Sequence, residues 1–159
     1  MPLMHESSLR ALGPSVVWTV ASLPDNSDAP NGSESVPYRT ARSLRILIVE
    51  DEILIALDLR NLVEEGGHVV VGIVESADYA TATATRERPD VVLMDIALAG
   101  PRDGIDAALE LRARLDIPSL FVSAHPDLSL RRRAEAAKPV GFLTKPVDED
   151  VLRRHLARL

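Results

Sequence analysis

Five short apolar runs, none of which alternates with polar residues, constrain the fold more than any other feature of this sequence. They lie at residues 44–50, 68–75, 90–95, 117–124 and 140–145. A strand with one face in water alternates apolar and polar residues, whereas a continuous apolar run is typical of a parallel strand covered on both faces. The sequence therefore predicts five buried parallel strands.

Segments with helical periodicity follow these runs, at residues 52–65, 76–88, 104–115, 126–138 and 148–159. In the first segment Ile55, Leu59 and Leu62 recur at helical spacing, and two glycines end the pattern. Ser76 is a candidate N-cap for the second segment. Because each right-handed crossover returns the chain to a parallel strand, the alternation predicts a doubly wound α/β fold with a five-stranded parallel sheet.

The composition changes near residue 43. Residues 21–43 are rich in Ser, Pro, Asn and Asp, as expected of a linker or disordered segment. The apolar stretch before it, which contains Trp18, is interpreted either as an unstructured extension or as an arm that docks on a partner. We therefore expect a mostly disordered extension over residues 1–43 and one domain over residues 44–159.

Charge and composition exclude several classes of protein. A formal net charge of −6 gives little support for binding nucleic acid, and the absence of cysteine excludes disulfides and cysteine-based catalysis. No run reaches the roughly 20 apolar residues of a membrane-spanning helix. The N-terminal flanks are poor for a secretory signal. We expect a cytoplasmic protein that contacts neither nucleic acid nor membrane.

Polar residues gather where the predicted strands end: Glu50 and Asp51, Asp95, Ser123 and Lys145. The carboxyl ends of parallel strands meet at one edge of the sheet, where such folds bind their ligands. Glu75 ends the second run and is expected outside the site if that strand lies at the edge of the sheet.

These side chains suit phosphoryl chemistry. Three carboxylates repel one another unless a cation offsets their charge, and clustered hard oxygens suit Mg²⁺. A lysine and a serine hydroxyl can contact phosphoryl oxygens. The sequence has neither a P-loop nor a dinucleotide-binding glycine motif. The pattern therefore indicates a site that receives a phosphoryl group on a carboxylate.

The motifs "ILIVEDE", "VVLMD", "FVSA" and "FLTKP", in this order, resemble the receiver domain of two-component response regulators over Leu44 to Leu159. The resemblance implies a flavodoxin-like (βα)5 fold of the stand-alone type, since the fifth helix ends the chain. It implies that Asp95 is the phosphoacceptor. It also implies that Mg²⁺ (or Mn²⁺) is bound by Glu50, Asp51, Asp95 and the backbone carbonyl of Ala97, with Asp51 the more direct ligand of the acidic pair.

The resemblance further implies that Lys145 and Ser123 stabilise the phosphoryl group and that Ser123 acts as a switch together with Phe142. Plain core packing of Phe142 stays open as an alternative. Pro146 matches a proline that often follows a cis peptide bond.

The resemblance implies binding rather than enzymatic activity. The expected partners are a sensor histidine kinase or a histidine phosphotransfer protein, an unknown downstream protein, and a homodimer formed through the fourth helix, fifth strand and fifth helix. Whether the chain is an output switch or a relay is left open. The arginines at 131–133 are a solvated helix face or a contact with a partner.

Two departures from the family pattern concern the segment after Asp95. Position 99 is Ala where a proline is common, and Asp103-Gly104 comes one residue late, so we expect a longer and looser loop over residues 96–103. Two other functions remain as alternatives: a phosphorylation-independent adaptor, and a Mg²⁺-dependent phosphatase that forms an aspartyl phosphate. The phosphatase would need an Asp-x-Asp motif where this chain has Glu50-Asp51-Glu52.

Overall fold

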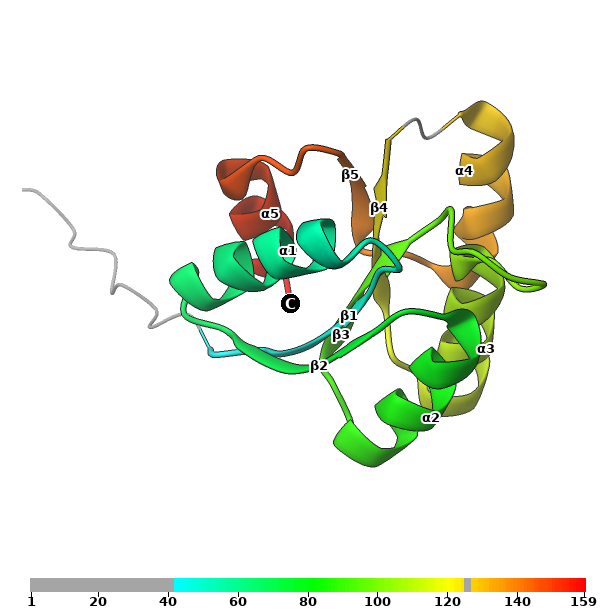
Figure 1. Cartoon of the computed structure of the whole chain (residues 1–159), viewed down its shortest axis with the longest axis horizontal. Coiled ribbons are helices and arrows are strands. Elements are labelled where there is room, and N and C mark those ends of the chain that lie inside the picture. Colours follow the sequence, from blue (N-terminus) through cyan, green and yellow to red (C-terminus); the bar gives the residue numbers. More distant parts are fainter. Residues whose placement is uncertain (1–41, 125–126) are drawn as a thin grey trace, which may run out of the picture. The chain divides into compact units, whose positions relative to one another are not determined.

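The computed structural model describes residues 42–124 and 127–159, so residues 1–41 of the predicted N-terminal extension lie outside the described residues. The described part contains the predicted parallel sheet, with strand order β2-β1-β3-β4-β5 (Figure 1). Its strands are β1 (Arg45–Val49), β2 (Val69–Val74), β3 (Val91–Asp95), β4 (Ser119–Ser123) and β5 (Gly141–Thr144). Neighbouring strands pair in parallel throughout, which confirms the doubly wound α/β fold.

Within residues 42–124 and 127–159, five α-helices connect or follow the strands. They are α1 (Ile53–Glu65), α2 (Ala77–Glu87), α3 (Gly104–Leu115), α4 (Leu128–Ala134) and α5 (Glu149–Leu156). The predicted helix over residues 126–138 is shorter than expected, because α4 ends at Ala134 and a 3₁₀ turn, Glu135–Ala137, follows it. Such tighter turns are common at the carboxyl ends of helices, and apolar periodicity does not reveal them.

The helices cover both faces of the sheet, and each face has its own core. On one face, α1 and α5 pack against the sheet through Ala56, Leu59, Val63, Leu152 and Leu156. On the other face, α2, α3 and α4 do so (Figure 1), and this core includes Phe121 of β4. All five residues of β3 and of β4 are buried, which explains why their sequences are continuous apolar runs.

Side-chain caps fix the starts of four helices. Ser76 accepts a hydrogen bond from the Tyr79 N–H, as predicted for the start of α2. Asp127 and Asp148 cap α4 and α5 in the same way. Asp103 caps α3 within a capping box completed by Asp106, so the first turn of α3 is anchored directly after the segment that follows Asp95.

None of the helices in the described ranges is long and apolar enough to cross a membrane.

His68 joins the beginnings of β1 and β2 and gives the fold a pH dependence. The Leu44 N–H donates to Nδ1 of His68 at 3.2 Å, which requires that this nitrogen carry no proton. Burial lowers the pKa of His68, because the charged ring would lose hydration. The neutral ring therefore stabilises the folded state fully above about pH 6.5, the ordinary histidine pKa, and this stability is lost as the pH falls toward the lower folded-state pKa.

We expect His68→Asn, which retains an acceptor near the Nδ1 position but does not titrate, to have a weaker pH dependence of stability. The thermal unfolding midpoint of the wild type should fall more than that of His68→Asn between about pH 7.5 and about pH 5. Circular dichroism at several pH values measures both slopes, and equal slopes would contradict a role for His68.

Candidate functional site

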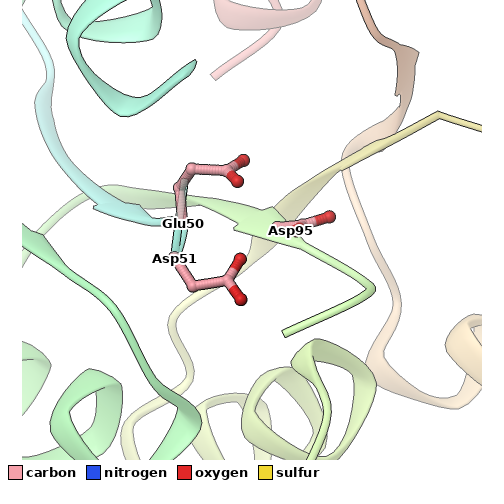
Figure 2. A group of neighbouring side chains, drawn as sticks. All are labelled: Glu50, Asp51 and Asp95. Atoms are coloured by element: carbon pink, nitrogen blue, oxygen red, sulfur yellow. The ribbon is translucent and has the colours of Figure 1, made fainter. Parts of the chain in front are cut away.

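Three carboxylates meet at the carboxyl edge of the sheet. Glu50 and Asp51 directly follow β1, and Asp95 is the last residue of β3 (Figure 2). One carboxylate oxygen from each residue lies within 4.8 Å of the other two. The strand order explains this proximity, because β1 and β3 are neighbours in the sheet although β2 lies between them in the sequence.

Two of the three acids are buried. Glu50 is 2% exposed and Asp95 is 4% exposed, whereas Asp51 is exposed to solvent. A buried carboxylate is costly unless a cation or hydrogen-bond donors compensate its charge. The cluster therefore needs a cation from elsewhere in the fold.

Lys145 supplies a positive charge to both buried acids. Its Nζ lies 2.7 Å from Oε2 of Glu50 and 3.3 Å from Oδ2 of Asp95. Lys145 follows β5, and β4 separates β5 from β3, so the lysine side chain extends across the end of β4 to reach the acids. In the described part of the chain, it is the one lysine or arginine that pairs with this cluster.

The pKa shifts follow from this arrangement. Burial, the largest cause, and repulsion from Asp95 together raise the pKa of Glu50, although Lys145 opposes the rise. Burial alone would lower the pKa of Lys145, but contact with Glu50 and Asp95 outweighs burial and raises it. Glu50 and Asp95 thus stabilise the charged form of Lys145, which in turn compensates their own negative charge.

The donor set fits a hard divalent cation. Three carboxylates face a single ammonium group, which leaves negative charge uncompensated at an edge that Asp51 opens to solvent. Mg²⁺ prefers oxygen ligands, takes one or two carboxylates and keeps several waters. The partial exposure of the cluster provides access for those waters.

The segment between β3 and α3 makes several contacts that the sequence did not predict. Ile96 and Leu98 are buried, and the Ala97 N–H donates to Oδ1 of Asp95 at 3.2 Å. Further along, Arg102 pairs with Asp78 of α2 and with Glu110 of α3. Side-chain contacts therefore anchor this loop, and the absence of a proline at position 99 gave no sign of them.

Ser123 and Lys145 are connected through the backbone at the ends of β4 and β5. Ser123 is 6% exposed, and its backbone carbonyl accepts a hydrogen bond from the Lys145 N–H at 3.0 Å. The peptide bond between Lys145 and Pro146 is cis. The register pairs Asp95 with Val122, so Ser123 lies one residue beyond the level of the acid on the adjacent strand.

Phe142 is half-buried in β5, where it packs against the core that contains Phe121. Its ring stacks on that of Phe121 with centroids 5.4 Å apart, and the guanidinium of Arg131 lies 4.9 Å from its centroid. Arg133 bonds to Asp103 and Asp106 at the start of α3. Arg131, Arg132 and Arg133 are all exposed, as expected of a solvated helix face, and two of them, Arg131 and Arg133, also contact residues within the chain.

Glu75 lies outside the three-carboxylate cluster, as expected, although it shares a cavity with two members of the cluster. Strand β2 is at the edge of the sheet, as anticipated, yet Glu75 lines a cavity of about 280 Å³ together with Glu50, Asp51 and the exposed side chains of Ile53 and Tyr79. The sequence could not show this, because the cavity is formed between the residues that follow β1 and residues of α1, β2 and α2.

Gly104 is a residue that the sequence analysis did not assign to the site. A Cβ at this position would lie 1.8 Å from the backbone oxygen of Asp95. Only glycine therefore allows the start of α3 to approach the end of β3 so closely. The glycine after Asp103 was the signal available in the sequence, because glycine permits a close approach of two backbone segments.

Comparison with known proteins decides the family. The family model described as the response regulator receiver domain matches residues 46–157. The chain belongs to this family of two-component signalling proteins. Over 102 residues it is 39% identical to the phyllosphere-induced regulator PhyR of Methylorubrum extorquens, a match that covers 64% of this chain and 38% of PhyR. It is also 34% identical over 111 residues to the protein PilH of Pseudomonas aeruginosa, covering 68% of this chain and 90% of PilH.

Solved receiver structures agree with the fold. The signal receiver domain of a modulated diguanylate cyclase from Desulfovibrio desulfuricans G20 superposes with a TM-score of 0.70 at 36% identity, covering 74% of this chain and 93% of that one. The chain spans 38% of the length of PhyR and 49% of the length of a second curated relative. Likeness to these relatives therefore concerns the receiver domain.

We expect Gly104→Ala to destabilise the receiver domain by at least about 1–3 kcal/mol, the usual cost of an overpacked site, because a backbone oxygen cannot rotate away. Urea unfolding followed by circular dichroism measures the change. Gly66→Ala is the control, since its Cβ would meet no atom nearer than 3.3 Å. Equal losses in the two variants would show that the contact with Asp95 is not limiting.

Proposed function

We propose that this receiver accepts a phosphoryl group on Asp95 from a histidine kinase or a histidine phosphotransfer protein in a Mg²⁺-dependent reaction. The observation that carries the proposal is the meeting of Glu50, Asp51, Asp95 and Lys145 at one edge of the sheet. In this proposal residues 44–159 form the receiver domain and residues 1–43 an extension of it.

Asp95 acts as the nucleophile. One of its carboxylate oxygens forms a bond to phosphorus while the bond from phosphorus to the donor's histidine nitrogen breaks, and the imidazole leaves. The Ala97 N–H, 3.2 Å from Oδ1, and Lys145, 3.3 Å from Oδ2, orient the carboxylate. Lys145 is also positioned to stabilise the negative oxygens of the transferred group.

The metal would be held by Glu50, Asp51, Asp95 and the backbone carbonyl of Ala97. When bound, Mg²⁺ supplies positive charge that neutralises phosphoryl oxygens during the transfer. The chain itself contributes the fixed orientation of the buried Glu50 and Asp95, because β1 and β3 are buried central strands that cannot shift easily.

Phosphorylation is read out through Ser123 and Phe142 in this proposal. The Ser123 hydroxyl would bond to a phosphoryl oxygen, and Phe142 would change its packing against Phe121 and Arg131. The surface of α4, β5 and α5 then changes and is recognised by a downstream protein or by a second copy of the chain. An output switch and a relay use the same acceptor, so both roles fit this mechanism.

An exposed apolar surface beside the acids fits a protein phosphodonor. At the start of α1, Ile53 and Leu54 lie two and three residues after Asp51, and their side chains are 63% and 79% exposed. Exposed apolar side chains next to a reactive edge are typical of a contact surface for a partner. We infer that the donor protein rests on this end of α1 while its histidine reaches Asp95.

Asp95→Asn should abolish phosphorylation by acetyl phosphate and Mg²⁺, because an amide cannot form the acyl phosphate. Intact-mass spectrometry measures the added phosphoryl group, and Asp58→Asn on the exposed face of α1 is the control. A wild type that gains no phosphoryl group would favour a phosphorylation-independent adaptor. Sustained turnover of a phosphomonoester would favour a phosphatase instead.

Leu54→Asp should slow transfer from an autophosphorylated histidine kinase by about tenfold, the effect of losing about 1.4 kcal/mol of docking energy. Phosphorylation by acetyl phosphate should be unchanged, since Leu54 does not belong to the carboxylate cluster. Radiolabel transfer in a panel of purified kinases measures the first rate. Leu159→Asp, which adds the same charge at an exposed residue after α5, is the matched control, and an equal slowing there would refute the contact.

A further inference from the structure

The loop after Asp95 is fastened to two helices by one side chain. Arg102 Nη1 lies 3.2 Å from Oδ1 of Asp78 on α2, and its Nη2 lies 2.5 Å from Oε2 of Glu110 on α3. The guanidinium is half-buried, with 35% of the side chain exposed. A planar forked donor that bridges two acids from different helices fixes its own backbone more strongly than a single surface pair would.

Between this anchor and Asp95, the same loop touches the acidic cluster. The Ala99 N–H donates to Oδ2 of Asp51 at 3.1 Å. Asp51 is the exposed acid of the cluster, so it lacks the packing that orients the buried Glu50 and Asp95. Apart from this hydrogen bond, the described residues give the Asp51 carboxylate no other donor.

Gly100 and Pro101 are exposed and lie between Ala99 and Arg102. On its other side Ala99 follows the buried Leu98. The short stretch that carries the Ala99 N–H is therefore fixed at one end by core packing and at the other by Arg102.

We propose that Arg102 is a positioning residue for the Mg²⁺ site: by anchoring the loop, it keeps the Ala99 N–H on Asp51 and so presents the Asp51 carboxylate in the orientation that binds the cation. This inference rests on the metal site of the proposed function. It adds a determinant of affinity that lies outside the ligands themselves.

The physical basis is preorganisation of a ligand by a hydrogen bond from a fixed neighbour. Hydrogen bonds to metal-binding carboxylates restrict their rotation, and loss of such supporting partners typically weakens metal affinity by 10- to 100-fold. Arg102 acts one step further away, through the loop, so an effect near the lower end, about tenfold, is expected.

Charge alone predicts that loss of Arg102 strengthens the binding of Mg²⁺, which is the opposite of the effect proposed here. Removing an arginine leaves the edge of the sheet more negative, which by Coulomb attraction would strengthen the binding of a divalent cation. Weaker binding by an Arg102 variant therefore cannot be a simple electrostatic effect. Arg114 provides a matched control, since it pairs with the same Glu110 at 2.6 Å but belongs to α3 and does not anchor the loop.

The experiment titrates ¹⁵N-labelled full-length protein with MgCl₂ and follows amide chemical shifts. Wild type, Arg102→Ala, Arg102→Lys and Arg114→Ala are compared. Arg102→Ala should raise the Kd for Mg²⁺ about tenfold, and Arg102→Lys, which keeps the charge but not the fork, about threefold. Arg114→Ala should leave the Kd within about twofold of wild type, as an exposed pair contributes little.

The amide proton of Ala99 gives a second readout that needs no metal. It should exchange with solvent faster in Arg102→Ala than in wild type or Arg114→Ala. Should Arg102→Ala not fold, as judged by its amide spectrum, Arg102→Lys carries the comparison.

The outcomes separate the two proposals. An unchanged Kd for the Arg102 variants, or an equal change in Arg114→Ala, overturns the positioning role and leaves the metal site intact. A wild type whose amides at Asp51 and Asp95 do not respond to MgCl₂ overturns the metal site itself, and the positioning role with it. Weaker binding confined to the Arg102 variants, with faster exchange at Ala99, supports the inference.

Discussion

The repulsion between two buried carboxylates, opposed by one lysine, is the constraint on which the rest of the site depends. Glu50 and Asp95 are held together because β1 and β3 are adjacent buried strands, and Lys145 reaches both from beyond β5. The sheet tolerates this concentration of charge at its edge because both its faces are packed by helices. The rigid, tightly packed sheet thus holds an excess of negative charge at its edge, which a divalent cation can neutralise.

Ion pairs connect that edge with the helices on one face of the sheet. Arg102 links the loop after Asp95 to α2 and α3, while Arg133 of α4 bonds to the two acids of the α3 capping box. Asp103 is both the N-cap of α3 and the partner of Arg133. Burial alone would raise the pKa of its carboxyl, but the contact with Arg133 and the capping hydrogen bonds outweigh burial and lower this pKa. The start of α3 is therefore a junction between the acidic cluster and α4.

The sequence predicted the fold and the set of polar residues at the strand ends well, because both depend on local patterns. Continuous apolar runs require burial on two faces, and parallel strands carry their carboxyl ends to one edge. The same local patterns did not reveal contacts between distant segments. Arg102 ties the loop after Asp95 to α2 and α3, and Arg131 and Arg133, although exposed, contact Phe142 and the start of α3.

The sequence by itself determined that this chain forms a doubly wound sheet with acids, a serine and a lysine at its carboxyl edge, since periodicity and residue type suffice for that. Only the tertiary structure decided which acids are buried, how Lys145 spans the end of β4 to reach them, and why position 104 must be glycine. The physical reason is that distances between side chains from different strands follow from strand order and packing, neither of which any local pattern of residues encodes.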